Sequence, residues 1–407
     1  MKIIKQSHRF ATLVVASLLL FSCESDDTTD DPVLQTDPPI ELSCNYFSNN
    51  PNAVLEDNPN APVDYIVSCK MSIPDDVTIE PGVTIAFQTN TGFAILETGS
   101  LKAIGTVNKP ITFTGVDKER GAWGGIYFNS NDSKNEFNHT ILEYAGGTAV
   151  YGGSSEKGGI VYGPGSSLKL TNSLIQHCTG WGINLYYTVN EERTTIESNT
   201  FKENAIPLQI SSAMIDVVKS NNQFIDNTIN KVEVKNTFSI GGGNKTMHKL
   251  SVPYSIVNGN GVFSIAEGNL VIQPGTVIEM GAGKYIEIRA SGSLKAVGTS
   301  SEKIIIRGDV EAPGGWQNIQ FHTTSSPNNQ FKHVIIKHAG AGANPNSNIH
   351  IRGAVYLGYA PTVLIEDTHF EDILSCIIYS DQHGMGNLTI GANVTSTNVN
   401  TANLDCP

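Results

Sequence analysis

Residues 99–106, Gly-Ser-Leu-Lys-Ala-Ile-Gly-Thr, return 193 positions later as Gly-Ser-Leu-Lys-Ala-Val-Gly-Thr at residues 292–299. Further matches lie on both sides at the same offset or at one residue more. Matches this dense at one spacing indicate a tandem duplication, with repeated segments at about 64–252 and 254–380. The matched pairs are Pro81 with Pro274, Trp123 with Trp316, Ile126 with Ile319, Phe128 with Phe321, Phe137 with Phe331, His139 with His333, Gly159 with Gly353, Val161 with Val355 and Tyr162 with Tyr356.

Each repeat also has a shorter rhythm. Runs of β-branched and aromatic residues, such as 83–87, 111–113 and 304–306, are separated by Gly, Asn, Ser and Asp, and helical periodicity is absent. A strand-and-turn unit of about two dozen residues cannot bury its apolar face alone, so it must stack on its neighbours. The sequence therefore predicts an all-β solenoid. A sandwich or propeller, the alternative, would show alternating hairpins with two-residue turns, which the sequence lacks.

The repeat motifs resemble those of right-handed parallel β-helix proteins of the pectin-lyase-like superfamily. The resemblance rests on residues 99–106, on Trp123-x-x-Ile126-x-Phe128, and on Phe-x-His-x-Ile-x-x-x-Ala-Gly at 137–146 and 331–340. It extends over nearly all of 64–390. It implies one continuous right-handed parallel β-helix made of two tandem copies, joined near Val252-Pro253. These motifs are specific for the fold and do not specify an activity.

The first 22 residues have the order of a secretory signal peptide, with a basic start, an apolar run at 10–21 and small Ser22 before Cys23. The twelve residues of this run span about 18 Å as a helix, too little for the roughly 30 Å core of a bilayer. Leu20-Phe21-Ser22-Cys23 resembles the lipobox of bacterial lipoproteins. The resemblance implies that residues 1–22 are removed and that Cys23 carries fatty acids such as palmitate.

Residues 23–43 contain seven acidic residues and no basic one, which predicts a disordered, extended tether. An acidic stretch directly after the acylated Cys resembles the surface-export signal of Bacteroidetes lipoproteins, and the alternative is a solvated spacer. The expected location is the outer membrane, lipid-anchored and facing the cell exterior. The other predicted boundaries are a first β-helix copy with an N-terminal cap at 44–253 and a second copy with a C-terminal cap at 254–407.

The chain is acidic. Its formal net charge is −13, from 39 acidic and 26 basic residues, and becomes −16 when Lys2, Lys5 and Arg9 leave with the signal peptide. Proteins bind nucleic acid by releasing counterions from phosphates with Lys and Arg, so we exclude nucleic acid as a partner. The expected partners are a polysaccharide or a surface protein, besides the membrane itself.

Cysteine use is consistent with an exported protein. A disulfide between Cys44 and Cys69 would close the N-terminal cap, and one between Cys376 and Cys406 would hold the C-terminal strand. Cys178 would then be a small buried apolar residue. Connectivity cannot be deduced from sequence, so both pairs are hypotheses. No spacing of Cys and His resembles a zinc site, and we predict no metal ion or cofactor.

Catalysis is the main alternative to binding, because many parallel β-helix proteins are polysaccharide lyases or hydrolases. A lyase of this kind needs carboxylates that hold Ca²⁺ against a uronate and an Arg or Lys that takes the α-proton, and a hydrolase needs a carboxylate pair. The sequence shows neither cluster clearly. Arg289, Arg307 and Arg352 are the candidate bases, since the first copy has uncharged residues at the matching positions. The alternative is that they lie on a solvated sheet face.

Trp181, Tyr186 and Tyr187 are the best candidates for a glycan site. They precede Glu191-Glu192-Arg193, and outward aromatic rings on a sheet provide stacking platforms for sugars. Adjacent strand residues point to opposite faces, so only one of the two tyrosines should face outward. The alternative is that Trp181 and one tyrosine fill the core or a loop.

Residues at turns have a structural explanation. His139 and His333 match between the copies, which favours a turn or a stacked hydrogen bond over catalysis. Asparagines near turns tolerate the left-handed conformation and are expected to cap backbone groups. These are Asn172, Asn199, Asn222 and Asn227. Trp123 and Trp316 are expected to pack structurally in both copies.

The expected function is therefore that of a surface-exposed outer-membrane lipoprotein whose β-helix binds glycans or other surface polymers, within a polysaccharide-utilisation system. One alternative is a polysaccharide lyase acting on an anionic glycan such as pectin, alginate or ulvan, with Ca²⁺ as its cofactor. Another is a structural or adhesive surface protein. The negative net charge opposes capture of a polyanion and favours neutral glycans.

Overall fold

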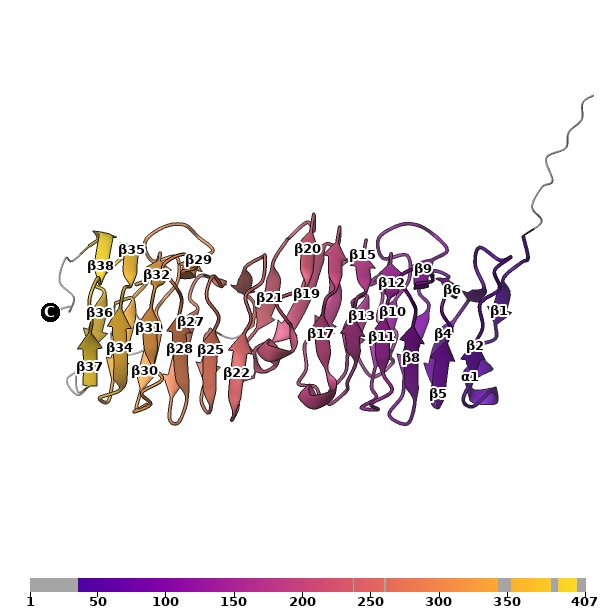
Figure 1. The fold of residues 1–407 in the computed structure, drawn as a ribbon, viewed down its shortest axis with the longest axis horizontal. Helices are drawn as coiled ribbons and strands as arrows, with labels where there is room; N and C mark the ends of the chain where they lie inside the picture. Colours follow the sequence, from indigo (N-terminus) through magenta and orange to yellow (C-terminus); the bar gives the residue numbers. More distant parts are fainter. Residues whose placement is uncertain (1–35, 237, 260, 343–352, 382–386, 401–407) are drawn as a thin grey trace, which may run out of the picture. The chain divides into compact units, whose positions relative to one another are not determined.

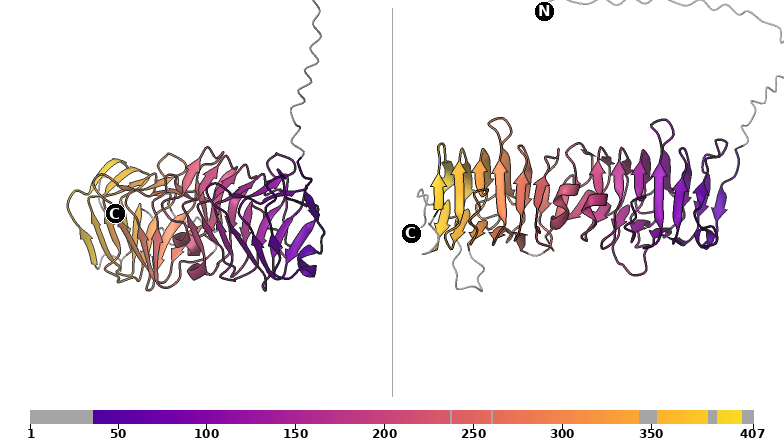
Figure 2. Two further views of the ribbon diagram at one scale, coloured as in Figure 1. Left: turned by 45° about the vertical axis from the view of Figure 1, so that its right-hand side comes forward. Right: turned by 60° about the horizontal axis from the view of Figure 1, so that its bottom comes forward.

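The computed structural model describes residues 36–236, 238–259, 261–342, 353–381 and 387–400. The strands belong to one compact unit, residues 37–407. Strands of successive coils lie side by side in sequence order, and every pair among the described residues is parallel (Figures 1 and 2). The fold is a parallel β-helix, as the repeats predict. No helix in the described part is long and apolar enough to cross a membrane.

A thirteen-stranded sheet, which we call sheet C, runs through the unit from its first coils to its last. Its strands are β4 (Lys70–Ile73), β7 (Gly92–Ile95), β10 (Gly125–Phe128), β13 (Ile160–Tyr162), β16 (Trp181–Leu185), β19 (Ile206–Ser211), β21 (Val232–Lys235), β23 (Tyr254–Ile256), β26 (Val277–Met280), β29 (Ile304–Gly308), β32 (Val334–Lys337), β35 (His369–Ile373) and β38 (Thr395–Val399).

Two sheets complete the coils of the first copy, and each coil visits C, B and A in that order. Sheet B contains β2 (Val54–Leu55), β5 (Asp76–Ile79), β8 (Ser100–Ile104), β11 (Glu136–Asn138), β14 (Lys169–Thr171) and β17 (Thr195–Glu197). Sheet A contains β1 (Ile40–Leu42), β3 (Tyr65–Val67), β6 (Thr84–Phe87), β9 (Ile111–Gly115), β12 (Thr140–Glu143), β15 (Leu174–Gln176), β18 (Thr200–Lys202) and β20 (Gln223–Ile225).

Two other sheets complete the coils of the second copy, in the order C, D and E. Sheet D contains β24 (Val262–Ile265), β27 (Tyr285–Arg289), β30 (Ile319–His322), β33 (Val355–Gly358) and β36 (Ile378–Ser380). Sheet E contains β22 (Asn244–Met247), β25 (Asn269–Ile272), β28 (Ser293–Val297), β31 (Gln330–Lys332), β34 (Thr362–Glu366) and β37 (Asn387–Ile390). Helical segments are short: α1 (Tyr46–Asn49), η1 (Glu191–Arg193) and η2 (Ser212–Val217).

Apolar side chains fill the inside of the coils because strand residues alternate. In β8, Leu101 and Ala103 are buried while Lys102 between them is exposed. Trp123 and Trp316 are fully buried, as expected. The indole N–H of each donates to a backbone carbonyl, at 2.8 Å in the first copy and 2.7 Å in the second. Each buried tryptophan thus satisfies its one polar group.

The matched histidines are turn residues, as the duplication suggests. His139 and His333 have φ angles of 49° and 50°, in the left-handed region that makes a tight corner between strands. Their carbonyl oxygens accept the backbone N–H groups of Ile111 at 3.2 Å and of Ile304 at 3.1 Å. The backbone at these positions therefore links neighbouring coils, which explains the match without chemistry.

Stacked asparagines cap the turns of the first copy. Asn199 Oδ1 accepts the backbone N–H of Ser173 at 3.0 Å, and Asn222 Oδ1 accepts the N–H of Asn199 at 3.0 Å. At the next turn the N–H of Asn204 donates to Asn227 Oδ1 at 2.9 Å. The capping role expected for asparagines at these turns is confirmed for 199, 222 and 227.

Strands that match at the 193-residue spacing belong to different hydrogen-bonded sheets. By the 193-residue spacing, β7, β8 and β9 correspond to β27, β28 and β29. β7 lies in sheet C whereas β27 lies in sheet D, and β29, the counterpart of sheet-A strand β9, lies in sheet C. In the described part, sheets A and B stop where D and E begin. The stack is therefore continuous through sheet C alone.

Ion pairs connect the last coils that contain sheets A and B to the first coils that contain sheets D and E. Lys231 Nζ lies 2.5 Å from Glu279 Oε2, and His248 Nε2 lies 2.9 Å from Asp216 Oδ1. Lys245 pairs with Glu191 of η1. Side chains thus make contacts where two of the three strand ladders are interrupted.

Two matched pairs of the repeats are wrong. The sequence spacing pairs Tyr162 with Tyr356 and Val161 with Val355, but the strand register makes Ile160 the counterpart of Val355 and Val161 the counterpart of Tyr356. A shift of one residue turns each side chain to the other face of a strand. Both runs are apolar, so their sequences fit either register and only the hydrogen-bonded pairing distinguishes them.

The N-terminal cap is built from α1 and a disulfide between Cys44 and Cys69, whose Cα atoms are 5.9 Å apart. The predicted tether, residues 23–43, overlaps the folded unit, because β1 pairs with β3 and Leu42 is buried. Cys178 is a free, buried thiol, and burial raises its pKa to about 12. Cys376 is buried, but Cys406 lies outside the described residues, so that pairing stays a prediction.

Candidate glycan-binding site

A single row of side chains points outward along sheet C. In β21, for example, Val232 and Val234 are buried in the core, so Glu233 between them faces the outside. Strand register carries this row from coil to coil. Its members are Ser72, Ala94, Tyr127, Val161, Asn184, Gln209, Glu233, Ser255, Glu279, Arg307, Lys337, Glu371 and Thr397.

The loop between β12 and β13, residues 144–159, covers the first part of this row. Its Val150 and Tyr151 form a small apolar cluster with Tyr127 and Val161, separate from the main core. The rings of Tyr127 and Tyr151 stack with centroids 4.7 Å apart. Burial raises the pKa of Tyr127, so its hydroxyl stays protonated and able to donate.

Trp181, Tyr186 and Tyr187 lie on the same outer side. The indole N–H of Trp181 donates to Glu233 Oε2 at 2.8 Å, which places this half-buried ring over the outward row. Lys235 Nζ lies 4.0 Å from the centroid of the Tyr186 ring, and the rings of Tyr186 and Tyr187 meet edge to face at 4.8 Å. Both tyrosines follow the end of β16 and are half-buried, so the expected strand alternation does not apply to them.

Buried amide and carboxylate groups lie beside these rings: Asn184 and Gln209 are 0% and 1% exposed, and Glu233 is 8% exposed. Asn184 Nδ2 donates to Glu156 Oε2 at 2.8 Å, and Gln209 Nε2 donates to Asn184 Oδ1 at 3.4 Å. Glu156 belongs to the loop over the sheet, whereas both amides and Glu233 belong to consecutive strands. We define the Trp181 site as Tyr127, Tyr151, Glu156, Trp181, Asn184, Tyr186, Tyr187, Gln209 and Glu233.

The composition of the Trp181 site suits a sugar. Ligand sites in proteins are mostly apolar or aromatic, with a few fixed polar groups that determine orientation. Aromatic rings contact the C–H faces of a sugar, and carboxylates and amides bond its hydroxyls. Burial, and then the charge of Glu156, raises the pKa of Tyr187, so this phenol is also a neutral donor at physiological pH.

The structure does not bring the candidate arginines together. Arg307 belongs to the sheet C row and its Nη2 donates to Glu279 Oε1 at 2.6 Å. Arg289 lies at the end of β27 in sheet D, with its Nε 3.6 Å from Glu287 Oε2. Arg352 lies outside the described residues. The two described arginines therefore stand on different faces, each beside its own carboxylate.

The carboxylate of Glu279 remains ionised. Burial alone would raise its pKa, but the bonds to Lys231 and Arg307 outweigh burial and hold the pKa below its usual range. Within the described ranges, no group of three or more His, Cys, Asp or Glu side chains is arranged to hold a metal ion.

The sequence analysis names three of the five rings of the Trp181 site, Trp181, Tyr186 and Tyr187, and misses Tyr127, Tyr151 and the polar groups beside them. Asn184, Gln209 and Glu233 are spaced by 25 and 24 residues, which is the length of one coil, so this spacing could have found them. Glu156 comes from a loop that no repeat predicts. Cys23, the predicted lipid attachment residue, lies outside the described residues.

Comparison with known proteins gives one match. Residues 60–162 match the family model of the pectate-lyase like beta helix domain. The matched segment is about a quarter of the chain, and it includes Tyr127, Tyr151 and Glu156 but ends before Trp181. No curated protein and no solved structure matches the chain significantly.

Proposed function

We propose that this chain is a glycan-binding β-helix, anchored to the outer membrane through a lipid on Cys23, which faces the cell exterior and holds polysaccharide without cleaving it. The Trp181 site carries this proposal. It gathers four half-buried aromatic rings, Tyr151, Trp181, Tyr186 and Tyr187, with the half-buried carboxylate of Glu156, above the buried ring of Tyr127 and a buried layer of amide and carboxylate groups. The description of the matching family supports a polysaccharide as the class of ligand.

Charge favours uncharged sugars over polyuronates. Glu156 and Glu233 both belong to the Trp181 site, and Lys235 stands at its border over Tyr186. Two carboxylates against one ammonium repel a polyanion, as does the formal net charge of −13. Carboxylates instead accept hydrogen bonds from sugar hydroxyls.

The test is affinity electrophoresis through gels that contain xylan, glucomannan, laminarin or polygalacturonate. A neutral polysaccharide should retard the wild type, and Trp181→Ala should weaken retardation at least tenfold. Trp181→Phe should fall between them, because it keeps a ring and loses only the N–H bonded to Glu233. Tyr46→Ala, an aromatic substitution in the N-terminal cap, is the matched control. Equal mobility of all variants in every gel would contradict the proposal.

Cleavage is tested separately. The wild type is incubated with polygalacturonate, alginate and ulvan, with and without Ca²⁺, and ultraviolet absorbance of unsaturated uronates is followed. The proposal expects no rise. A sustained rise that scales with protein concentration would replace the binding function by the polysaccharide lyase.

Anchoring is tested in cells. Labelling with an alkyne fatty acid should mark the wild type, and Cys23→Ser should lose both label and membrane association. Protease added to intact cells should digest a surface-exposed protein. An unlabelled wild type would refute the lipid anchor, and protection until lysis would refute surface exposure.

A further inference from the structure

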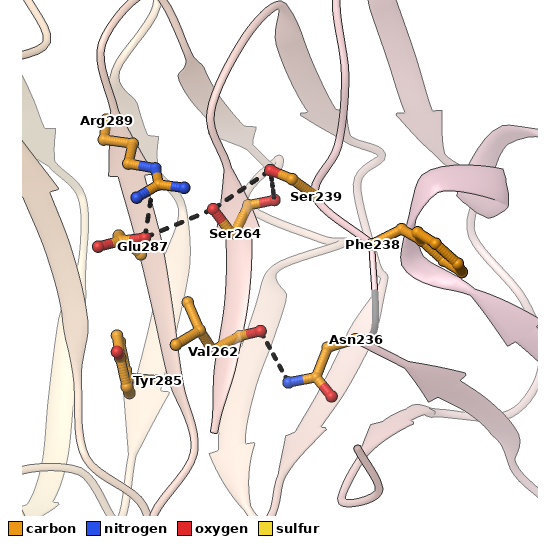
Figure 3. Close-up of a pocket in the computed structure, with 8 residues that line it drawn as sticks. All are labelled: Asn236, Phe238, Ser239, Val262, Ser264, Tyr285, Glu287 and Arg289. Atoms are coloured by element: carbon orange, nitrogen blue, oxygen red, sulfur yellow. Dashed lines mark hydrogen bonds and ion pairs between the residues drawn. The ribbon is translucent and has the colours of Figure 1, made fainter. Parts of the chain in front are cut away.

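A cavity of about 370 Å³ opens at the start of sheet D (Figure 3). It lies where sheets A and B end and sheets D and E begin, a place that we call the junction. We call this space the junction cavity. Its lining comes from the segment after β21 and from β24 and β27, and includes Asn236, Phe238, Ser264, Tyr285, Glu287 and Arg289.

The lining of the junction cavity is accessible to solvent and combines aromatic rings with charged groups. Phe238 is 37% exposed, and Tyr285 is half-buried. Arg289 Nε lies 3.6 Å from Glu287 Oε2, and the Arg289 side chain is 54% exposed. Figure 3 shows Tyr285 and Phe238 on opposite sides of the view, with Arg289 and Glu287 above Tyr285. The cavity thus presents aromatic surface together with hydrogen-bond donors and an acceptor.

Sheet D continues the side of the coil that sheet C occupies in the first copy. By the repeat spacing, β27 and β30 of sheet D are the counterparts of β7 and β10 of sheet C, and in Figure 1 β27 and β36 lie at the level of β10 and β13. The adjoining sheets agree, because η2 contacts β22 of sheet E, and Lys245 of β22 pairs with Glu191, which precedes β17 of sheet B. Ser212 of η2 also donates to the carbonyl oxygen of Phe238. The junction cavity therefore follows the Trp181 site along the axis of the solenoid.

Lys235 connects the border of the Trp181 site to the junction cavity. The ends of β16, β19 and β21 lie side by side, with Tyr186 directly after β16 and Lys235 at the end of β21. Lys235 Nζ lies 4.0 Å from the centroid of the Tyr186 ring. Asn236, the next residue, lines the cavity, and its Nδ2 donates to the carbonyl oxygen of Val262 in β24 at 2.8 Å. Contacts therefore lead from the tyrosine of the Trp181 site to the first strand of sheet D.

The length of this face follows from the coil spacing. Four steps separate the coil of β16 from the coil of β27, and at about 4.8 Å per step they cover about 19 Å. Tyr186 stands at one end of this span, Phe238 in the middle and Tyr285 at the other end. In the next two coils Gln320 and Tyr356 are 4% and 3% exposed, so we take β27 as the end of the face.

The junction cavity leaves the net charge of the face unchanged. Arg289 adds a guanidinium and Glu287 adds a carboxylate, and the two lie next to each other. Ser264 Oγ donates to Glu287 Oε2 at 3.4 Å and helps to hold this carboxylate in place. The pair offers donors and an acceptor to sugar hydroxyls without a net positive charge that would attract a polyanion. An uncharged glycan, the class proposed for the Trp181 site, therefore also suits the cavity.

We propose that the Trp181 site and the junction cavity are the two ends of one binding face, along which a single strand of neutral polysaccharide lies parallel to the axis of the solenoid. The inference rests on the proposed glycan binding. It adds the direction of the bound polymer and the length of the segment that the protein recognises. A saccharide that reaches both ends makes its second set of contacts within one complex, so it binds more tightly than a short one.

The test is isothermal titration with a trisaccharide and a hexasaccharide from each of three neutral series, the oligomers of xylose, mannose and glucose obtained from xylan, mannan and cellulose. Tyr285→Ala removes the ring at the far end of the face, and Tyr285→Phe keeps that ring. Tyr359→Ala changes an exposed tyrosine that directly follows β33 of the same sheet and is the matched control. Circular dichroism checks that each variant is folded.

The wild type should bind one equivalent of one hexasaccharide at least tenfold more tightly than the matching trisaccharide. Tyr285→Ala should lose most of this advantage and keep the affinity for the trisaccharide, whereas Trp181→Ala should weaken binding of both. Tyr285→Phe and Tyr359→Ala should behave as wild type. Equal affinities for the two lengths, two equivalents of hexasaccharide, or an unaltered hexasaccharide affinity in Tyr285→Ala would overturn the continuous face alone. No binding of any saccharide by the wild type would overturn the proposed function with it.

Discussion

The two copies agree inside and differ outside. On the outer face, Tyr127 corresponds to Gln320 and Ala94 to Glu287. Inward-facing residues match closely: Leu101 with Leu294, Ala103 with Ala296, Ile111 with Ile304, Trp123 with Trp316, Phe128 with Phe321 and Phe137 with Phe331.

Inward-facing residues stabilise the solenoid, whereas outward-facing residues form the surface that a ligand can contact. Inward positions are packed by the coils above and below, so a change of volume is felt by several neighbours. Outward positions contact fewer atoms and can change without disturbing the stack. One scaffold thus carries an aromatic surface in one copy and a surface of paired charges in the other.

The largest expected effect on stability comes from replacing the two matched tryptophans. Trp123→Ala and Trp316→Ala should each lower the free energy of unfolding by about 3–5 kcal/mol, because both rings are fully buried. Trp181→Ala, which alters a half-buried ring on the outer face, should cost about 1 kcal/mol or less. Urea unfolding measures all three. Equal losses in the three variants would show that inside and outside are not distinguished as described.

At one turn the first copy has stacked asparagines and the second copy does not, so substitutions at this turn test what the asparagines contribute to stability. Asn199→Ala leaves the buried N–H of Ser173 without its acceptor and should cost about 1–3 kcal/mol. Thr368 stands at the equivalent turn, and its hydroxyl donates to the carbonyl oxygen of Glu366 at 2.8 Å. Thr368→Val should cost less than Asn199→Ala in the same urea titration. The reverse order would show that the stacked asparagines do not stabilise the first copy.

The junction can be compared with a regular part of sheet C. Glu279→Gln removes the buried carboxylate that joins Lys231 of the first copy to Arg307 of the second, and it should cost about 1 kcal/mol because both cations are partly solvated. Glu371→Gln breaks the more exposed pair with Lys337 and should cost about 0.5 kcal/mol or less. Thermal unfolding at low and high salt distinguishes them. No difference between the two would remove the special role of the junction pair.

The smallest effect concerns pH. Burial lowers the pKa of His322 below its ordinary value of 6.5, so the unfolded chain binds a proton more readily than the folded one. Stability from this group is complete above about pH 6.5 and is lost as the pH falls through the lower folded pKa. His322→Asn, which installs the first copy's Asn129, should show a smaller loss of stability between pH 6.5 and 5. An identical pH dependence in both proteins would contradict this.

The fold could be predicted because the inward residues repeat, and repetition of buried rows leaves only stacked coils as a solution. The change of sheets between the copies could not, since it depends on hydrogen-bonded register around β21 and β23, which the sequence does not show. The Trp181 site was predictable in three of its rings, which sequence composition reveals. Its buried polar groups depend on register between strands, and Glu156 depends on the path of a loop.

The junction also decides how the molecule comes apart. In a solenoid each coil contacts only the coils before and after it. The stability of one coil therefore depends on the contacts with those two neighbours. Across the junction only sheet C carries ladder hydrogen bonds in the described part, so coupling there is weaker than within either copy. We therefore expect the coils on the two sides of the junction to unfold as separate cooperative units, with partial opening beginning between them.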